Sequence, residues 1–178
     1  MNKIFFVISL LIGFFIATNL LIAQQPQWIP AGIKNTTVLV ERFRYQDPEM
    51  AYSNIDEMYE DERIEFLEEA NNRLEQDNQK LEEVFKSYNG NLITIPAVKI
   101  DEVYPDMNIY RFVLKRDLFY GSKKTINPTT NNVEDKSYFA YRYYFYDRVS
   151  KTNYPAYYFS GDAWTQLKRL VFWLNKAN

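Results

Sequence analysis

The fold is decided by the aromatic stretch Ser137-Tyr-Phe-Ala-Tyr-Arg-Tyr-Tyr-Phe-Tyr-Asp147, which a polar turn separates from Tyr154-Pro-Ala-Tyr-Tyr-Phe159. Tyrosine and phenylalanine are typical strand residues, so these two segments predict an antiparallel hairpin. Alternate residues of a strand face opposite sides, and here both sides carry aromatic residues. Asp162 then begins an amphipathic segment that predicts a closing helix packed on the sheet.

The segments before this hairpin alternate between strand-like and helix-like patterns. A stripe of apolar residues at helical spacing ends at Asn89-Gly90, which is typical of a left-handed helix stop. A right-handed crossover would connect the strands on either side of this helix. The expected elements are strands at residues 36–45, 91–95 and 109–120 and a helix at residues 61–88.

Two further segments complete the expected topology. Residues 98–104 either prolong the second strand or form a separate edge piece. Residues 121–136 are polar and contain Asn127-Pro128, so they predict a long loop at the tip of a hairpin. The resulting order is β-α-β-β-β-β-α, an α+β (or α/β) fold with a mixed sheet of about five strands and two helices packed on it.

The first 23 residues have the composition of an export leader. Lys3 precedes an apolar run that closes at Ala23, the pattern of a secretory signal peptide. The run approaches the length that spans a bilayer, so an uncleaved N-terminal membrane anchor is the alternative. Both readings place the domain outside the cytoplasm, in the periplasm, cell envelope or medium. An extended lead-in at residues 24–35 and a single globular domain at residues 36–178 would follow.

The chain of 178 residues contains neither cysteine nor histidine. Their absence removes the thiolate nucleophile, the usual general base near neutral pH and the commonest transition-metal ligand. We therefore expect no enzyme activity, no cofactor and no metal. Asp101, Glu102 and Asp106 are typical of a polar turn, since a calcium loop needs regularly spaced ligands. Hydrolysis by a pair of carboxylates is the one enzymatic route that composition leaves open.

Acidic residues are concentrated in residues 49–88, which hold 13 acids and 4 bases. One interpretation is a negative face that recruits a basic partner, and the other is the solvated side of an amphipathic helix. The glutamates around residue 67 lack lysines at the spacing that would stabilise them within the helix. The possible partner-binding residues, on this helix and on the polar segment 121–136, are Glu65, Glu68, Glu69, Lys123 and Lys124.

Two parts of the chain resemble a known family, Ile109-Tyr-Arg-Phe-Val-Leu-Lys-Arg-Asp-Leu118 and Tyr143-Tyr-Phe-Tyr-Asp147 with Tyr157-Tyr-Phe-Ser-Gly161 before the closing helix. They are similar to the envelope α/β domain of curli-secretion lipoproteins and penicillin-binding-protein activators. That domain also resembles the N-terminal domain of the Tol translocation protein and anticodon-binding folds. The resemblance makes Asp147 the aspartate that precedes the family's turn. Asn153 would take the left-handed position of the usual glycine, and the lipid-anchoring cysteine of many members is absent.

The resemblance implies a non-catalytic envelope module that binds other proteins. We accordingly expect an exported protein-binding or assembly module with an envelope protein as its partner. The alternative is a carboxylate-dependent hydrolase or a carbohydrate-binding domain for cell-wall or exported polymer, with tyrosines stacked on sugars. The net charge of −2 argues against nucleic acid as a partner. Membrane contact is expected only through an uncleaved N-terminal segment.

Overall fold

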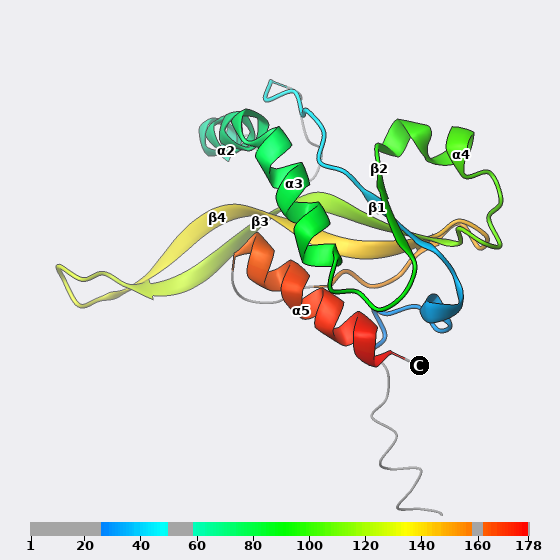
Figure 1. The fold of residues 1–178 in the computed structure, drawn as a ribbon. Helices are drawn as coiled ribbons and strands as arrows, with labels where there is room; N and C mark the ends of the chain where they lie inside the picture. The colour runs from blue at the N-terminus through cyan, green and yellow to red at the C-terminus, as the bar shows by residue number, and fades with distance from the viewer. Residues whose placement is uncertain (1–25, 50–58, 158–161, 178) are drawn as a thin grey trace, which may run out of the picture.

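The computed structural model describes residues 26–49, 59–157 and 162–177, so the expected leader lies outside the described residues. The strands are β1 (Val38–Glu41), β2 (Leu92–Ile95), β3 (Phe112–Ile126), β4 (Val133–Asp147) and β5 (Thr152–Asn153). They form one mixed sheet in the order β2-β1-β3-β4-β5, with helices packed across it (Figure 1). The expected α+β class and the sheet of about five strands are confirmed. No helix among the described residues is both long and apolar enough to cross a membrane.

The sheet has a short parallel part and a long antiparallel part. β1 runs parallel to β2 along its whole length and parallel to β3 at Leu39 and Val40. β3 and β4 pair antiparallel over all fifteen residues of each strand. Because β1 supports β3 near its start, the outer part of the β3–β4 hairpin, residues 116–142, projects beyond the parallel strands (Figure 1). We call this projecting part the arm.

The expected single helix of residues 61–88 is two helices, α2 (Glu60–Asn72) and α3 (Leu74–Phe85). Arg73, which separates them, has φ −103° and ψ 6° and so leaves helical geometry. The break directs α2 toward the arm and α3 toward the last helix, α5 (Ala163–Lys176) (Figure 1). Asp162 caps α5 as expected, since its carboxylate accepts hydrogen bonds from the backbone amides of Trp164 and Thr165.

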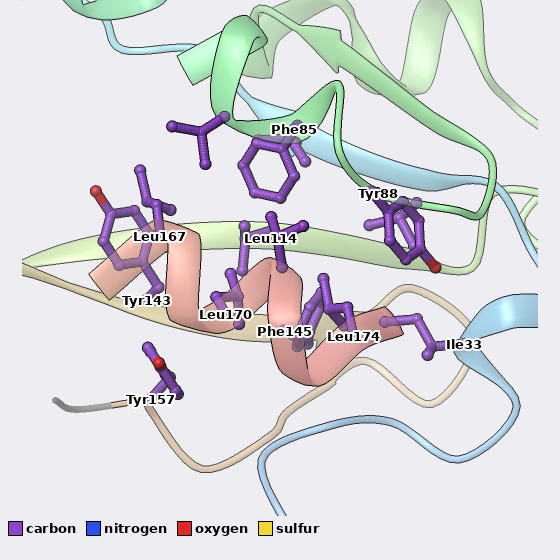
Figure 2. Close-up of a cluster of buried hydrophobic side chains, with 14 of the residues drawn as sticks. Ile33, Phe85, Tyr88, Leu114, Tyr143, Phe145, Tyr157, Leu167, Leu170 and Leu174 are labelled. Atoms are coloured by element: carbon purple, nitrogen blue, oxygen red, sulfur yellow. The ribbon is translucent and has the colours of Figure 1, made fainter. Parts of the chain in front are cut away.

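The larger hydrophobic cluster lies between these helices and one face of the sheet, which we call the first face. Figure 2 shows Leu167, Leu170 and Leu174 of α5 directed at aromatic and aliphatic side chains of β3 and β4. All three leucines are fully buried. They are spaced three and four residues apart, which is the spacing of one face of a helix. α5 therefore packs on the sheet with the face that the sequence predicts.

A smaller cluster on the second face of the sheet is covered by a short helix. Residues 98–104 are helical here, which overturns the expectation of a strand: a 3₁₀ turn leads into α4 (Ile100–Val103). Ile100 and Tyr104 both pack on the second face, and the amide of Tyr104 donates to the carbonyl of Ile100 at 3.0 Å. Apolar residues four apart meet on one side of a helix but alternate poorly in a strand, which decides the outcome.

Residues 121–136 are mostly strand, which corrects the expectation of a long loop. β3 continues to Ile126 and β4 begins at Val133, so six residues make the turn. Asn127 organises this turn through its side-chain oxygen, which accepts a hydrogen bond from the amide of Thr129 at 2.9 Å. Asn131 takes the left-handed conformation at φ 56°. The polar composition thus reflects an exposed paired ribbon rather than an irregular segment.

Three local expectations of chain reversal are also corrected. Neither Asn89 nor Gly90 has a positive φ, because α3 already ends at Phe85. In the turn after β4 the left-handed residue is Lys151, with φ 57°, rather than Asn153, which belongs to β5. The returning strand expected at residues 154–159 is reduced to β5 and a single bridge that Tyr157 makes to β4. Part of that segment, residues 158–159, lies outside the described residues.

Two asparagines join the broken helix to the chain that leaves β1. The buried side-chain amide of Asn78 accepts a hydrogen bond from the Phe43 amide at 2.7 Å and donates to the Phe43 carbonyl at 3.0 Å. Asn71 makes the same two bonds with Gln46, at 3.0 and 2.7 Å. Each asparagine side chain bonds the amide and the carbonyl of one residue, as a neighbouring strand would do. Buried backbone N–H and C=O groups need such hydrogen-bond partners. This explains why the apolar stripe of the helix is interrupted by polar residues.

Replacing Leu167 by alanine should lower the free energy of unfolding by about 2–5 kcal/mol, because the cavity forms in a fully buried part of α5. The measurement is the urea midpoint, with the exposed neighbour Lys168→Ala as a control that should change stability by less than about 0.5 kcal/mol. Equal midpoints for the two variants would contradict the packing described for α5.

Asn78→Leu should cost about 2–4 kcal/mol, since it leaves the amide and carbonyl of Phe43 buried without partners. The exposed Asn72→Leu serves as a matched control and should unfold close to the wild type. Hydrogen exchange at the Phe43 amide supplies a second readout, and its protection should fall in the Asn78 variant alone.

Candidate functional site

The arm is supported near its base by α2. The ring of Tyr59 stacks on Tyr120 with centroids 4.1 Å apart, and Phe66 lies 6.0 Å from Phe139 and 5.6 Å from Tyr141. The strand partners belong to the same face of the hairpin as the larger hydrophobic cluster. Aromatic pairs of this kind stabilise beyond their buried area. The first face of the arm is thus covered at its base.

The five predicted partner-binding residues lie on the arm and on α2, and all are exposed. Glu65, Glu68 and Glu69 are on α2, and Lys123 and Lys124 are on the outer half of β3. Within the described residues no ion pair joins the two groups. They share neighbouring elements, so one partner of sufficient size would contact both.

The second face of the arm carries rings and cations in alternation. Arg142 lies 5.9 Å from the ring centroid of Phe119, and Lys123 lies 5.8 Å from that of Tyr138. Nearer the sheet, the phenol of Tyr144 continues the same row. The long described helices α2, α3 and α5 pack against the first face, and this row lies on the opposite face of the hairpin. Half-buried aromatic rings with interleaved cations suit both protein and sugar contacts.

The tip of the arm exposes two apolar residues. Ile126 and Val133 pair with each other at the end of the hairpin, and each side chain is 65% exposed. Both residues lie beyond the hydrophobic core and beyond α2, so packing within the described protein does not account for their apolar character. Exposed apolar groups at a projecting end are typical of contact sites.

A cavity of about 550 Å³ opens where the second face meets α4. β2 and β3 lie on opposite sides of β1, and the connections that lead to them cross opposite faces of the sheet. Such a reversal is a topological switch point, and open sheets bind ligands outside the carboxyl ends of strands at this place. Glu41, the last residue of β1, and Lys115 of β3 line the cavity. The architecture itself therefore accounts for a crevice here.

The cavity wall is built around a buried arginine. The guanidinium of Arg148 donates to the carbonyls of Tyr104 at 2.8 Å and Tyr110 at 3.0 Å, and to the carboxylate of Asp101 at 2.8 Å. These bonds fix the loop after α4 against the turn after β4. Asp101 therefore lies at the edge of this hydrogen-bond network, where the guanidinium of Arg148 balances the charge of its carboxylate.

The floor of the cavity consists of paired charges and phenols. The ammonium of Lys115 lies 3.5 Å from the carboxylate of Glu41 and 4.6 Å from the ring centroid of Tyr146. The hydroxyl of Tyr144 donates to Asp117 at 3.2 Å. Burial, followed by the charge of Asp117, raises the pKa of Tyr144 to about 12, so this phenol remains a hydrogen-bond donor at neutral pH. The floor can bind a polar ligand, with each carboxylate engaged by a donor.

The three acidic residues considered as calcium ligands bond to separate partners. Asp101 bonds Arg148, whereas Glu102 pairs with Lys99 at 2.8 Å. Asp106 accepts a hydrogen bond from the amide of Asn108 at 2.9 Å and so forms a turn. Among the described residues, no three acidic side chains gather as a metal site would require.

Asp147 ends β4 and organises the following turn. Its carboxylate receives two hydrogen bonds from the Nε and one from the Nη2 of Arg111, the last at 2.7 Å, and it accepts the amide of Val149 at 2.9 Å. Burial by itself would raise the pKa of Asp147. The bonds from Arg111, Ser150 and Val149 outweigh that effect and hold the pKa below its ordinary value. The aspartate is therefore a structural anchor at the edge of the cavity wall.

Comparison with known proteins adds no relative. No protein-family model matches the chain, and no curated protein matches it significantly. The fold and the site define an α+β domain with a projecting two-stranded arm and a cavity at the switch point of its sheet. Functional inference rests on these features of the chain.

The cavity was missed by the sequence analysis, although a weak signal exists. In the third strand Val113 is followed on the same face by Lys115 and Asp117, which indicates that this face becomes polar after Val113. The expectation of a strand at residues 98–104 concealed the second wall. A predicted helix at residues 98–104 would have indicated that an element covers this face of the sheet.

Asp147→Asn should lower the free energy of unfolding by about 1–3 kcal/mol at pH 7, because the charged bonds from Arg111 are lost. A carboxyl with a lowered folded-state pKa stabilises above its unfolded pKa of about 3.9, and this contribution disappears as pH falls through the folded value. The difference between variant and wild type should therefore shrink below about pH 4. Urea midpoints across pH measure it, with Asp117→Asn as the half-exposed control. A pH-independent difference would contradict the assignment.

Proposed function

We propose that the protein is an exported, non-catalytic module of a bacterial-type cell envelope that binds another envelope protein through its arm. The observation that carries this proposal is the arm itself, a ribbon that extends past the sheet and ends in exposed Ile126 and Val133. The composition of the first 23 residues supports export.

The strand edges of the arm favour a protein partner. In the described chain β1 pairs with β3 at Leu39 and Val40, so β3 beyond Leu114 is joined to β4 and to no other strand. A strand of another protein can add to the edge of such a ribbon, and main-chain hydrogen bonds then supply much of the affinity. The exposed lysines of β3 and the acidic surface of α2 would set which partner is accepted.

The absence of catalysis is supported by how the cavity uses its acids. Glu41 is paired with Lys115, Asp101 with Arg148, and Asp117 accepts the hydroxyl of Tyr144. A general acid or nucleophile of a hydrolase must face its substrate, whereas each of these carboxylates already has one oxygen engaged by a protein donor. The composition also supplies no histidine or cysteine to replace them.

A second candidate function is carbohydrate binding, and the row of rings on the second face favours it. Phe119, Tyr138 and Tyr144 are half-buried side chains that form a strip on the second face of the hairpin. Such rings can stack on sugar units of a wall polymer. The strip is interrupted by Arg142 and Lys123, whose charges suit an acidic protein or acidic sugar equally well.

Photo-crosslinking from the arm tests the proposed protein contact. A photoreactive residue at Thr129, in the exposed tip, should give a discrete cross-linked protein band in envelope preparations, whereas one at exposed Val98 should not. The double variant Ile126→Ser and Val133→Ser should lower capture of the same protein by at least about tenfold, as expected when a central apolar contact is lost.

The matched control is Val98→Ser, which removes an apolar side chain of greater exposure elsewhere on the molecule. Capture that survives the tip variants, or equal cross-linking from both positions, would remove the arm as the contact element. Retention on wall polysaccharide that is lost in Tyr144→Ala and kept in the tip variants would establish the carbohydrate alternative instead.

A further inference from the structure

α5 presents a surface that the proposed function does not use. Lys168, Arg169, Phe172 and Lys176 are all exposed, and we call them the basic stripe. At 3.6 residues per turn these positions fall within an arc of about 100°. Between Ala163 and Lys176 the helix contains cations and no acidic residue of its own.

An apolar ring lies within this positive stripe. Phe172 is 52% exposed, although α5 already buries a complete face of leucines. The ammonium of Lys176 lies 4.3 Å from its ring centroid, and Trp173 meets the ring edge-on at 5.8 Å. An exposed aromatic residue between cations is the composition of helices that lie in a bilayer interface, where the ring enters the headgroup region and the cations meet lipid phosphates.

The start of the domain lies at the same end of the molecule. The ammonium of Lys34 donates to the carbonyl of Asn175 at 2.9 Å, which joins the lead-in to the C-terminal end of α5 (Figure 1). Four peptide units, through residues 23–25, connect Ile22 of the apolar run to Pro26, the first described residue. They span at most about 14 Å. An apolar run retained in a bilayer would therefore hold this end of the domain close to the lipid surface.

We propose that the basic stripe of α5 docks on the surface of an anionic lipid bilayer. The stripe supplies charge complementarity, Phe172 supplies the apolar insertion, and the lead-in supplies proximity. This contact adds to the membrane contact expected from the N-terminal segment. It leaves the arm available to a protein partner, because the arm and the stripe belong to different elements.

The chain lacks cysteine, so a single introduced cysteine carries a spin label at one known place. The full chain labelled at Phe172→Cys or at Val98→Cys is reconstituted in phosphatidylcholine vesicles with and without phosphatidylglycerol. Accessibility of the label to oxygen, relative to a water-soluble nickel complex, measures its depth. The label at position 172 should move into the interface when phosphatidylglycerol is present, and the label at position 98 should stay aqueous.

Charge removal gives the matched comparison. Replacing Lys168, Arg169 and Lys176 by glutamine should weaken the phosphatidylglycerol-dependent docking by on the order of 100-fold, since each cation near an anionic surface contributes on the order of fivefold. The control removes the same charge elsewhere, by glutamine at Lys99, Lys123 and Lys124, and should keep the response. Urea midpoints of both variants confirm that the fold is retained.

Four outcomes would overturn the proposal. The label at position 172 could remain as aqueous as the label at position 98 in anionic vesicles. Both labels could respond equally, which would show general adsorption, or the response could survive loss of the three charges. Immobilisation of the label by soluble polyglutamate, with no change of depth in vesicles, would assign the stripe to an acidic protein.

Discussion

The β3–β4 hairpin is longer than the sheet that holds it, and the described helices are arranged around this mismatch. β1 gives β3 a neighbour for two residues, so α2 must support the arm while α3 covers the core. The helix changes direction at Arg73 to do both, and Asn71 and Asn78 tie its two halves to one extended segment. At the junction the guanidinium of Arg116 donates to the backbone carbonyls of the last residue of β1 and of the residue after it, and it lies 4.1 Å from the ring centroid of Phe43.

Local signals predicted the parts of this fold that are determined locally. The aromatic alternation of β4, the cap at Asp162 and the leucine spacing of α5 each identify an element without knowledge of its neighbours. The continuation of β3 through residues 121–126 depends on pairing with β4, so its polar composition indicated a loop. The break at Arg73 carries no proline or glycine. The break lets α2 cover the arm and α3 cover the core, and these two surfaces exist only once the sheet is assembled.

The candidate site was predictable to a smaller extent than the fold. The exposed positions on α2 and β3 follow from charge and pattern, and the structure places them on neighbouring elements. The cavity at the switch point joins β1, β3, α4 and the turn after β4, which are far apart in the sequence. Arg148 shows the difficulty, because arginine is rarely buried in proteins. Its burial here depends on the carbonyls of Tyr104 and Tyr110, which are distant in the sequence.

The topology of β1 also has a kinetic consequence. The fifteen pairs of β3 and β4 close a six-residue turn, and local hairpins of this kind form on the microsecond scale. Val38, Leu39 and Val40 are synthesised before either of the strands that cover them and pair with segments far along the chain. Such non-local parallel pairing is slow to form and leaves an apolar strand open to aggregation in the meantime. This short apolar strand must therefore be shielded from other chains until β2 and β3 are available to pair with it.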